Sequence, residues 1–344
     1  MKFSVGLPTA GRSLMLRAAL DSIRAQSRPD LITEIIVSEN GGDPASADIV
    51  REYPDLPIVY RTRQPCLEVS AHFIQLVTEL QGPWVALLGD DDMWGRYHLE
   101  EAARQLLNDP DATGFTSQTV SVGNESRQVR NGFTRLLRSY PGGNGDGYRA
   151  CWRWDAEDLL VESLMRTPLN LWALVVQKTC LLKAMDFFDE GGLYLDSDRY
   201  LFWRLAMQGP VLVGREVGLF YRTHENANST QLEKSEPAFH FEISKGYTLR
   251  MIADAESAGI NWRLRWSETW NSLSSRDQRE VWKESLRGAR SALESVVGPL
   301  VEPPAVVAQD KWKRLCKLAL PPLVSSLLSR GFRLAARYTK GHSR

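Results

Sequence analysis

The sequence has few cysteines and no long apolar run. No stretch of 18 apolar residues occurs, so no segment is predicted to span a membrane. The N-terminal apolar run is short and is interrupted at Pro8 and Gly11, so we expect no secretory signal peptide. A disulfide framework is equally unexpected in a chain of 344 residues. We therefore expect a cytoplasmic protein with reduced thiols; its four cysteines, which lack zinc-site spacing, are Cys66, Cys151, Cys180 and Cys316.

The formal net charge is zero, yet the charge is unevenly distributed. The segment from Lys311 to Arg344 holds nine Lys or Arg residues and no Asp or Glu, which leaves about −9 on the residues before it. A basic segment behind an acidic body indicates an anionic partner. Residues 311–344 also contain Leu, Trp and Phe, so they have the composition of a helix on an anionic membrane surface, broken at Pro321-Pro322. A packed helical hairpin with a basic outer face is the alternative.

Strand and helix patterns alternate over the first 110 residues. Short β-prone runs end in turn or polar residues, and the segments between them carry apolar residues at helical spacing. Ser13 is placed to cap the first helix. This alternation predicts a mostly parallel sheet with helices on both faces. The expected strands are 2–7, 34–38, 57–61 and 84–88, and the expected helices have their apolar residues within 16–23, 69–80 and 99–107.

The pattern is less regular after residue 110. Polar and Gly-rich residues at 122–150 predict a long surface loop or lid. The sequence turns helical from about residue 236, so we divide the chain into an α/β domain, 1–235, and a helical C-terminal region, 236–344. Further strands are expected at 113–121, 171–177 and 211–221, and further helices at 197–206, 244–258 and 275–297.

Three polar clusters follow strands of the predicted sheet. They are Pro8-Thr9 after the first strand, Glu39-Asn40 after the second and Asp90–Asp92 after the fourth. In a parallel sheet the carboxyl ends of the strands meet at one edge, where ligands bind. We therefore expect these clusters to lie on one rim.

The three adjacent carboxylates of Asp90–Asp92 repel one another, so they require a cation. Mn²⁺ and Mg²⁺ take oxygen ligands and commonly bridge protein carboxylates to substrate phosphates. A solvated acidic turn ahead of a helix is the alternative. At the end of a buried strand, the triplet favours a metal site.

Several segments resemble the family 2 glycosyltransferases with the GT-A fold. The segments that carry the resemblance are FSVGLPTAGR, LRAALDSIRAQ, EIIVSENGG and WVALLGDDDMW. The resemblance implies a Rossmann-like, nucleotide-diphospho-sugar transferase fold. It also implies that Pro8, Thr9 and Glu39 bind the nucleotide, that Asp91 lies nearer the ribose and metal, and that Asp92 is the metal ligand. The family has Asp more often than Glu at position 39, so the contact made by Glu39 is open.

The resemblance extends to about residue 230, through LDSDRYLFWRLAMQG and EVGLFYRTHENANST. It implies that Asp198 is the catalytic acid residue, with Asp196 in reserve, and that His224 contacts the metal or diphosphate. Both aspartates also suit a helix N-terminus, and the two readings are compatible. Arg63, after the third strand, is a candidate nucleotide contact or a solvated residue. His72, where relatives often have Asn, is either a binding residue or part of the helix face.

These features predict a metal-dependent, inverting glycosyltransferase. It would move a sugar from a nucleotide-diphosphate donor to a hydroxyl of a glycan or lipid-linked acceptor. Asp198 would take the acceptor proton. Relatives of this size suggest surface polysaccharide synthesis, peripheral to the inner face of the cell membrane and without nucleic acid. A nucleotidyltransferase and a non-catalytic nucleotide-sugar-binding protein are the alternatives. Candidate sugar-stacking aromatics are Trp94, Trp152, Trp154, Trp172 and Trp203.

Overall fold

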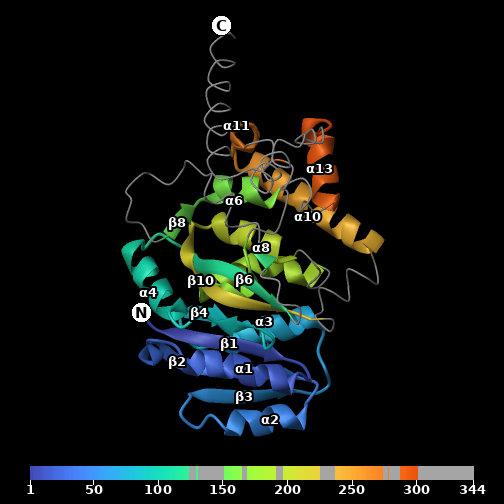
Figure 1. Cartoon of the computed structure of the whole chain (residues 1–344). Helices are drawn as coiled ribbons and strands as arrows, with labels where there is room; N and C mark the ends of the chain where they lie inside the picture. Colours follow the sequence, from blue (N-terminus) through green and yellow to red (C-terminus); the bar gives the residue numbers. More distant parts are fainter. Residues whose placement is uncertain are drawn as a thin grey trace, which may run out of the picture. The chain divides into compact units, whose positions relative to one another are not determined.

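A computed structural model of the chain describes the residues that form one compact unit, Met1–Val301, with gaps (Figure 1). The predicted lid, apart from its first two residues and a short strand, lies outside the described residues, as do Asp196 and the basic segment 311–344. The described residues are 1–123, 129–130, 151–164, 169–190, 197–224, 237–273, 278 and 287–300.

One mostly parallel sheet organises this unit, in the order β3-β2-β1-β4-β9-β6-β10-β5. Its parallel pairs are β1–β2, β2–β3, β1–β4 and β6–β10, whereas β9 is antiparallel to both β4 and β6. The predicted architecture is confirmed, with antiparallel strands added beyond β4. The strands are β1 (Phe3–Thr9), β2 (Ile32–Asn40), β3 (Ile58–Arg63), β4 (Trp84–Leu87), β5 (Met93–Trp94), β6 (Gly114–Gly123), β7 (Val129–Arg130), β8 (Cys151–Trp154), β9 (Val175–Gln177) and β10 (Val211–Thr223).

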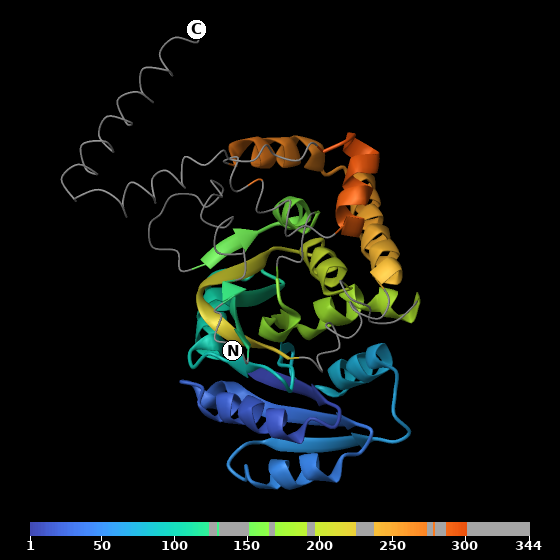
Figure 2. The same cartoon turned by 45° about the vertical axis from the view of Figure 1, so that its right-hand side comes forward.

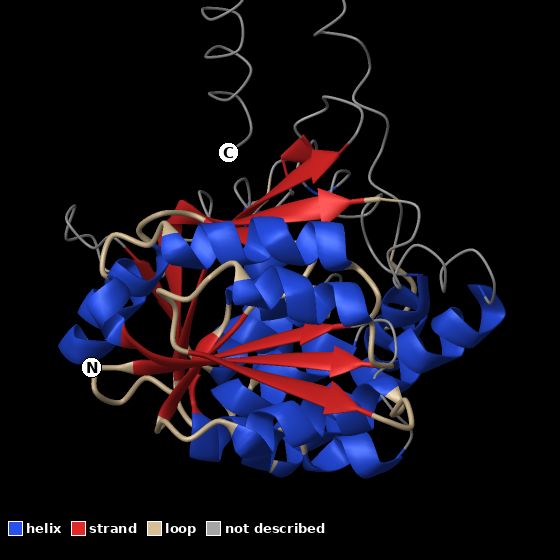
Figure 3. Cartoon of the chain, turned by 90° about the horizontal axis from the view of Figure 1, so that it is seen from below, coloured by secondary structure: helices blue, strands red, loops and turns tan. Residues whose placement is uncertain are grey.

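Helices cover both faces of the sheet, as Figure 3 shows. Strand β4 explains why both faces need cover, because Ala86 joins one apolar cluster while Val85 and Leu87 join the other. Side chains alternate between the faces of a strand, so an all-apolar strand is buried on both. One face carries α1 (Ser13–Arg24), α2 (Pro44–Arg51) and α4 (His98–Asn108), and the other carries α3 (Val69–Glu79), α6 (Ala156–Ser163), α7 (Lys178–Ala184) and α8 (Ser197–Ala206).

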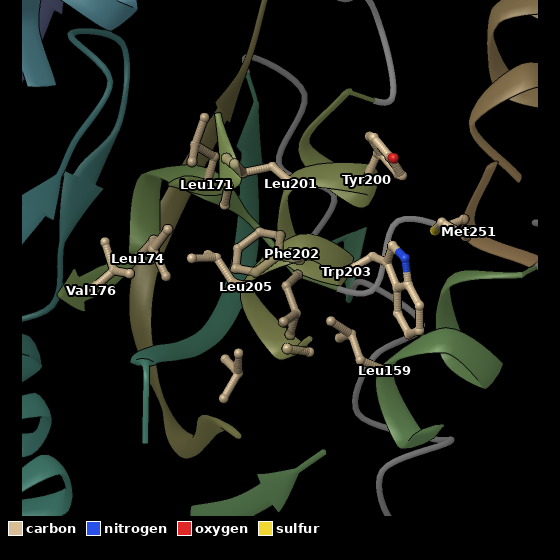
Figure 4. Close-up of a cluster of buried hydrophobic side chains, with 14 of the residues drawn as sticks. Leu159, Leu171, Leu174, Val176, Tyr200, Leu201, Phe202, Trp203, Leu205 and Met251 are labelled. Carbon is tan, nitrogen blue, oxygen red and sulfur yellow. The ribbon is translucent and has the colours of Figure 1, made fainter. Parts of the chain in front are cut away.

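The C-terminal part of the unit is helical. It consists of α10 (Pro237–Ser257), α11 (Trp262–Ser272) and α13 (Arg287–Val297), and α10 and α13 lie side by side (Figure 2). Helix α10 places Met251 in the same apolar cluster as Trp203 of α8 (Figure 4). The Nε1–H of Trp203 also donates to Asp254 Oδ2 at 3.2 Å. The division of the chain at residue 235 stays a prediction.

No helix in the described part of the chain is long and apolar enough to cross a membrane. Two local predictions are wrong. Ser13 is the first helical residue of α1 and not its cap; the N-cap is Arg12, and no side chain caps this end. Residues 171–177 are not one strand, because Asn170 Oδ1 accepts a hydrogen bond from Trp172 N (2.9 Å) and starts the 3₁₀ turn η2 (Leu171–Ala173) before β9.

Strand β1 is longer than predicted, since it continues through Pro8 to Thr9. Its pairing with β4 ends at Gly6, whereas its pairing with β2 continues to Thr9 opposite Glu39. The end of β1 therefore pairs on one side only, a position in which Pro is tolerated.

Candidate active site

The polar residues that follow β1, β2 and β4 lie at one rim of the sheet, as the sequence predicts. Thr9 and Glu39 are register partners at the ends of β1 and β2. The turn after β1 brings Gly11 N to 3.1 Å from Glu39 Oε1. Gly11 has φ +66°, in the left-handed region that favours glycine, so the residue type suits this turn. The rim is thus closed by direct contacts between the strand ends.

The aspartate triplet is the most strongly charged part of this rim. Asp90 and Asp92 are buried, with 1% and 0% exposure. The guanidinium of Arg12 bridges two of the three acids, because Nη1 lies 2.6 Å from Asp91 Oδ2 and Nη2 lies 3.0 Å from Asp90 Oδ1. Asp92 Oδ1 accepts a hydrogen bond from the backbone N–H of Arg222 at 2.8 Å. We call these three acids, Arg12 and His224 the triplet network.

Burial dominates the electrostatics of the triplet network. It raises the pKa of Asp90 to about 6, even though the positive charge of Arg12 acts in the opposite direction. Burial also raises the pKa of Asp92 well above its ordinary value, and the negative charge of Asp91 adds to this effect. The site therefore holds more negative charge than its own partners stabilise.

His224 lies just after β10 and reaches the same acids. Its Nε2 is 3.2 Å from Asp91 Oδ2, across 133 residues of sequence. The sequence predicts His224 beside the metal ligand Asp92, and the structure brings it to the neighbouring acid. Its Nδ1 is buried without a hydrogen-bond partner in the described part of the chain.

Four further buried polar atoms of this rim also lack a hydrogen-bond partner among the described residues. They are Thr9 Oγ1, Glu39 Oε2, Asp90 Oδ2 and Asp92 Oδ2. Buried polar atoms are normally hydrogen-bonded, so a cluster of unpaired ones indicates a place where an ion or ligand binds. Carboxylate oxygens and imidazole nitrogens are also the atoms that bind Mn²⁺ or Mg²⁺, so the residues fit the predicted metal. Among the described residues, no group of three or more His, Cys, Asp or Glu side chains is arranged to hold a metal ion.

Arg63 belongs to a second buried network, which we call the Ser38 network: Ser38, Arg63, His72 and Glu79. Arg63 Nε donates to Ser38 Oγ at 3.0 Å, and Nη2 pairs with Glu79 Oε2 at 2.7 Å. His72 Nε2 lies 2.8 Å from the same Ser38 Oγ. Burial and the charge of Arg63 lower the pKa of His72, and the hydrogen bond from Arg63 lowers the pKa of Glu79. The nucleotide contact of Arg63 stays a prediction.

Asp198 lies in the first turn of α8, where a negative charge interacts favourably with the helix dipole. Its Oδ1 accepts the backbone N–H of Arg199 at 2.9 Å. The structure therefore puts Asp198 one residue inside the helix and not at the cap, and its catalytic role stays a prediction. Asp196 lies outside the described residues.

Sequence reasoning missed two members of the site. Arg12 follows the Pro-Thr turn, so the predicted topology that placed this turn and the triplet on one rim could also have placed Arg12 there, although its partners are 78 and 79 residues away. Arg222 acts through its backbone N–H, which carries no sequence signal. Of the predicted aromatics, Trp154 and Trp203 are core residues.

Residues 4–155 match the sequence profile of Glycosyl transferase family 2. The abequosyltransferase RfbV of Salmonella typhimurium is 28% identical over 142 residues, which cover 40% of this chain and 42% of that protein. The match thus spans less than half the length of this curated relative. The fold is similar to that of S. aureus TarS residues 1–349, solved in complex with UDP-GlcNAc, with a TM-score of 0.56 and 13% identity over 87% of this chain and 77% of that one. This likeness supports the GT-A fold.

Proposed function

We propose that this chain, a member of glycosyl transferase family 2, is a metal-dependent, inverting glycosyltransferase that uses a nucleotide-diphosphate sugar. The observation that carries the proposal is the buried Asp92 next to the half-buried Asp91, with His224 beside Asp91 and Asp92 Oδ2 open. A buried excess of carboxylate at the rim of a parallel sheet is a binding site for a cation and the phosphates it bridges.

The nucleotide would lie along the ends of β1 and β2. Glu39 supports this placement, because its Oε1 is held by Gly11 N while Oε2 is free to accept an N–H from a base or a ribose hydroxyl. Pro8 and Thr9 form the adjacent backbone, and Asp91 would reach the ribose. Arg63 has weaker support, since only its Nη1 makes no hydrogen bond within the described residues.

The metal would be held by Asp92 through Oδ2 and by His224. A bound Mn²⁺ or Mg²⁺ would neutralise the charge that develops on the departing diphosphate. Arg222 N fixes Asp92 through the opposite carboxylate oxygen, so Oδ2 is preoriented for this role. His224 is turned toward Asp91 by its Nε2, which leaves Nδ1 for the ligand.

Asp198 would be the base that takes the proton from the acceptor hydroxyl. Topology supports this assignment, because α8 ends at Ala206 and β10 begins only five residues later, at Val211. Helix and strand then run in opposite directions, and a ten-residue helix is about 15 Å long. The start of α8 is therefore directed toward the end of β10, where Arg222 and His224 lie.

The acceptor would be a glycan or lipid-linked hydroxyl in surface polysaccharide synthesis. The name of the Salmonella relative, an abequosyltransferase, supports transfer of a sugar, and its match is confined to 142 residues. A role of residues 311–344 at an anionic membrane surface also belongs to this proposal, because their charge and apolar content suit it.

A panel experiment tests the proposal against the two alternatives. The purified chain is incubated with UDP-, GDP-, CDP- and dTDP-sugars, with Mn²⁺ or with a chelator, while thermal stabilisation and slow donor hydrolysis are recorded. We expect one donor to stabilise the protein and to be hydrolysed only with metal. Consumption of nucleoside triphosphates with sugar phosphates would favour a nucleotidyltransferase, and binding without turnover over any acceptor would favour a binding protein.

The role of Asp198 has its own test. Asp198→Asn should lower transfer by about 10²-fold or more, which is the usual contribution of a general base, while the affinity for the nucleoside diphosphate stays within twofold. The matched control is Asp186→Asn, which removes an exposed acid paired with Arg204. Equal transfer by Asp198→Asn and wild type would refute the assignment.

A further inference from the structure

Trp172 lies opposite the start of the aspartate triplet. Strand β9 is antiparallel to β4, with Ala86 paired to Val175, and Leu87 N bonds to Leu174 O at 3.0 Å. Because the two strands are antiparallel, Trp172, three residues before Val175, and Gly89, three residues after Ala86, both lie beyond the same end of the pair. The indole is half-buried and packs against the apolar clusters on both faces of the sheet.

Contact between the Trp172 ring and Gly89 is direct. A Cβ built on Gly89 would lie 3.2 Å from Cε2 and 3.3 Å from Cδ1 of the indole, and 3.0 Å from Asp91 Oδ1. Cε2 and Cδ1 are the two ring atoms bonded to Nε1, and both lie nearer to this Cβ than Nε1 does. The Cβ would therefore sit over the face of the ring and not beyond its N–H edge. The ring therefore lies over the backbone of the turn that positions Asp91, and Gly89 leaves room for it.

Trp172 is fixed in this position by its backbone and by its ring. The backbone O of Trp172 accepts the Nε1–H of Trp94 at 2.8 Å, and the backbone N of Trp172 donates to Asn170 Oδ1 at 2.9 Å. Phe73 packs against the ring edge to face, with centroids 6.2 Å apart. The Trp172 Nε1–H itself donates no hydrogen bond within the described residues and is open to solvent. A rigid side chain thus presents an unused donor beside the acids.

We infer that Trp172 binds the glycosyl ring of the donor, through a hydrogen bond from Nε1–H to a sugar hydroxyl and through contact with the indole. This inference rests on the proposed function. The sugar is joined to the second phosphate of the donor, so a diphosphate at Asp91 and Asp92 brings the sugar beside the same turn. Tryptophan suits such a ligand, because it combines an apolar ring with one N–H donor.

The test compares two ligands that differ only in the sugar. Binding of a nucleoside diphosphate and of the matching nucleotide-glucose is measured by calorimetry with Mn²⁺, using whichever of the UDP, GDP, CDP and dTDP pairs binds wild type most tightly. Trp172→Phe keeps an aromatic ring against Gly89 and Phe73 and removes the N–H. Trp84→Phe is the matched control, since Trp84 is also half-buried but begins β4, at the end of the strand that lies away from the triplet.

We expect Trp172→Phe to weaken nucleotide-glucose binding about fivefold, as loss of one hydrogen bond does, while nucleoside diphosphate binding changes less than twofold. Trp84→Phe should change neither. Equal weakening of both ligands, or of neither, would overturn the inference and leave the proposed function standing. A raised acceptor KM with unchanged donor binding would also overturn it, by assigning the indole to the acceptor. If wild type binds no nucleotide, the proposed function fails and this inference fails with it.

Discussion

Two charge networks lie near the carboxyl ends of the parallel strands, and they are built in different ways. In the Ser38 network, Arg63 is matched by one carboxylate, Glu79, and by the hydroxyl of Ser38, which His72 also contacts. In the triplet network, three carboxylates share one guanidinium and one imidazole, and Asp92 Oδ2 is left open. The charges of the Ser38 network are matched within the protein, whereas the charges of the triplet network are matched only when a ligand binds.

This difference separates structural from functional charge. A buried ion pair whose partners are both present fixes the positions of the elements that carry them and requires no ligand to balance its charge. Burial raises the pKa of Asp90 and Asp92, and the negative charge of Asp91 adds to this effect, so such a site persists where a cation can relieve it. Carboxylates and arginines are therefore structural in the Ser38 network and functional in the triplet network.

The largest effect should follow from Asp92→Asn. The amide keeps an acceptor for Arg222 N but loses the charge that would bind metal. We expect transfer to fall roughly 10³-fold, because several kcal/mol of charge stabilisation would be lost. The stability of the ligand-free protein should be equal or higher, since a buried charge is removed. Asp48→Asn, an exposed acid paired with Arg51, is the control. Turnover within tenfold of wild type would contradict a functional role for the charge of Asp92.

Arg63→Met should act on stability. It leaves Glu79 and Ser38 without their partner, and Glu79 is 29% exposed, so we expect a loss of about 2 kcal/mol in the free energy of unfolding, below the range for a fully buried pair. Urea denaturation measures this loss. Nucleoside diphosphate affinity, measured where the variant is folded, should change less than threefold. A large loss of affinity with unchanged stability would instead support the nucleotide contact predicted for Arg63.

The smallest effect is a pH dependence of opposite sign in the two networks, measured in a chelator. Folded Asp90 has a raised pKa of about 6, so its contribution to stability is lost as pH rises from about 4 to 6. Folded His72 has a lowered pKa, so stability is lost as pH falls below 6.5.

The variants Asp90→Asn and His72→Gln isolate these two contributions. The difference in unfolding free energy between variant and wild type should increase with rising pH for Asp90→Asn and with falling pH for His72→Gln. Each slope is at most about 1.4 kcal/mol per pH unit. Urea denaturation from pH 4.5 to 7.5 gives both slopes, and slopes of the same sign would contradict the assignment of charge states.

The strand ends could be predicted because β-prone runs and the polar residues behind them are contiguous in sequence. The parallel arrangement followed from the alternation with helices, and it placed Thr9, Glu39 and the triplet on one rim. His224 was expected near the metal from the resemblance to family 2 glycosyltransferases, and its approach to Asp91 depends on the path of β10.

Ion pairs between residues far apart in the sequence could not be predicted from it. Arg12 reaches Asp90 and Asp91 only because the turn after β1 folds back, and Arg63 reaches Glu79 only because α3 packs against β1 and β2. The predicted cap at Ser13 is wrong because α1 begins at Ser13, one residue earlier than a Ser13 cap would require. Trp172 gave no sequence signal that separated it from the buried tryptophans.

The central claim is that the triplet network binds a metal together with a nucleotide. Calorimetric titration of a nucleoside diphosphate, with and without Mn²⁺, into wild type and Asp92→Asn tests it most directly. We expect Mn²⁺ to tighten nucleoside diphosphate binding at least tenfold in wild type and to have no effect in Asp92→Asn. Binding to wild type that is equally tight with a chelator, or a full metal effect in Asp92→Asn, would contradict it.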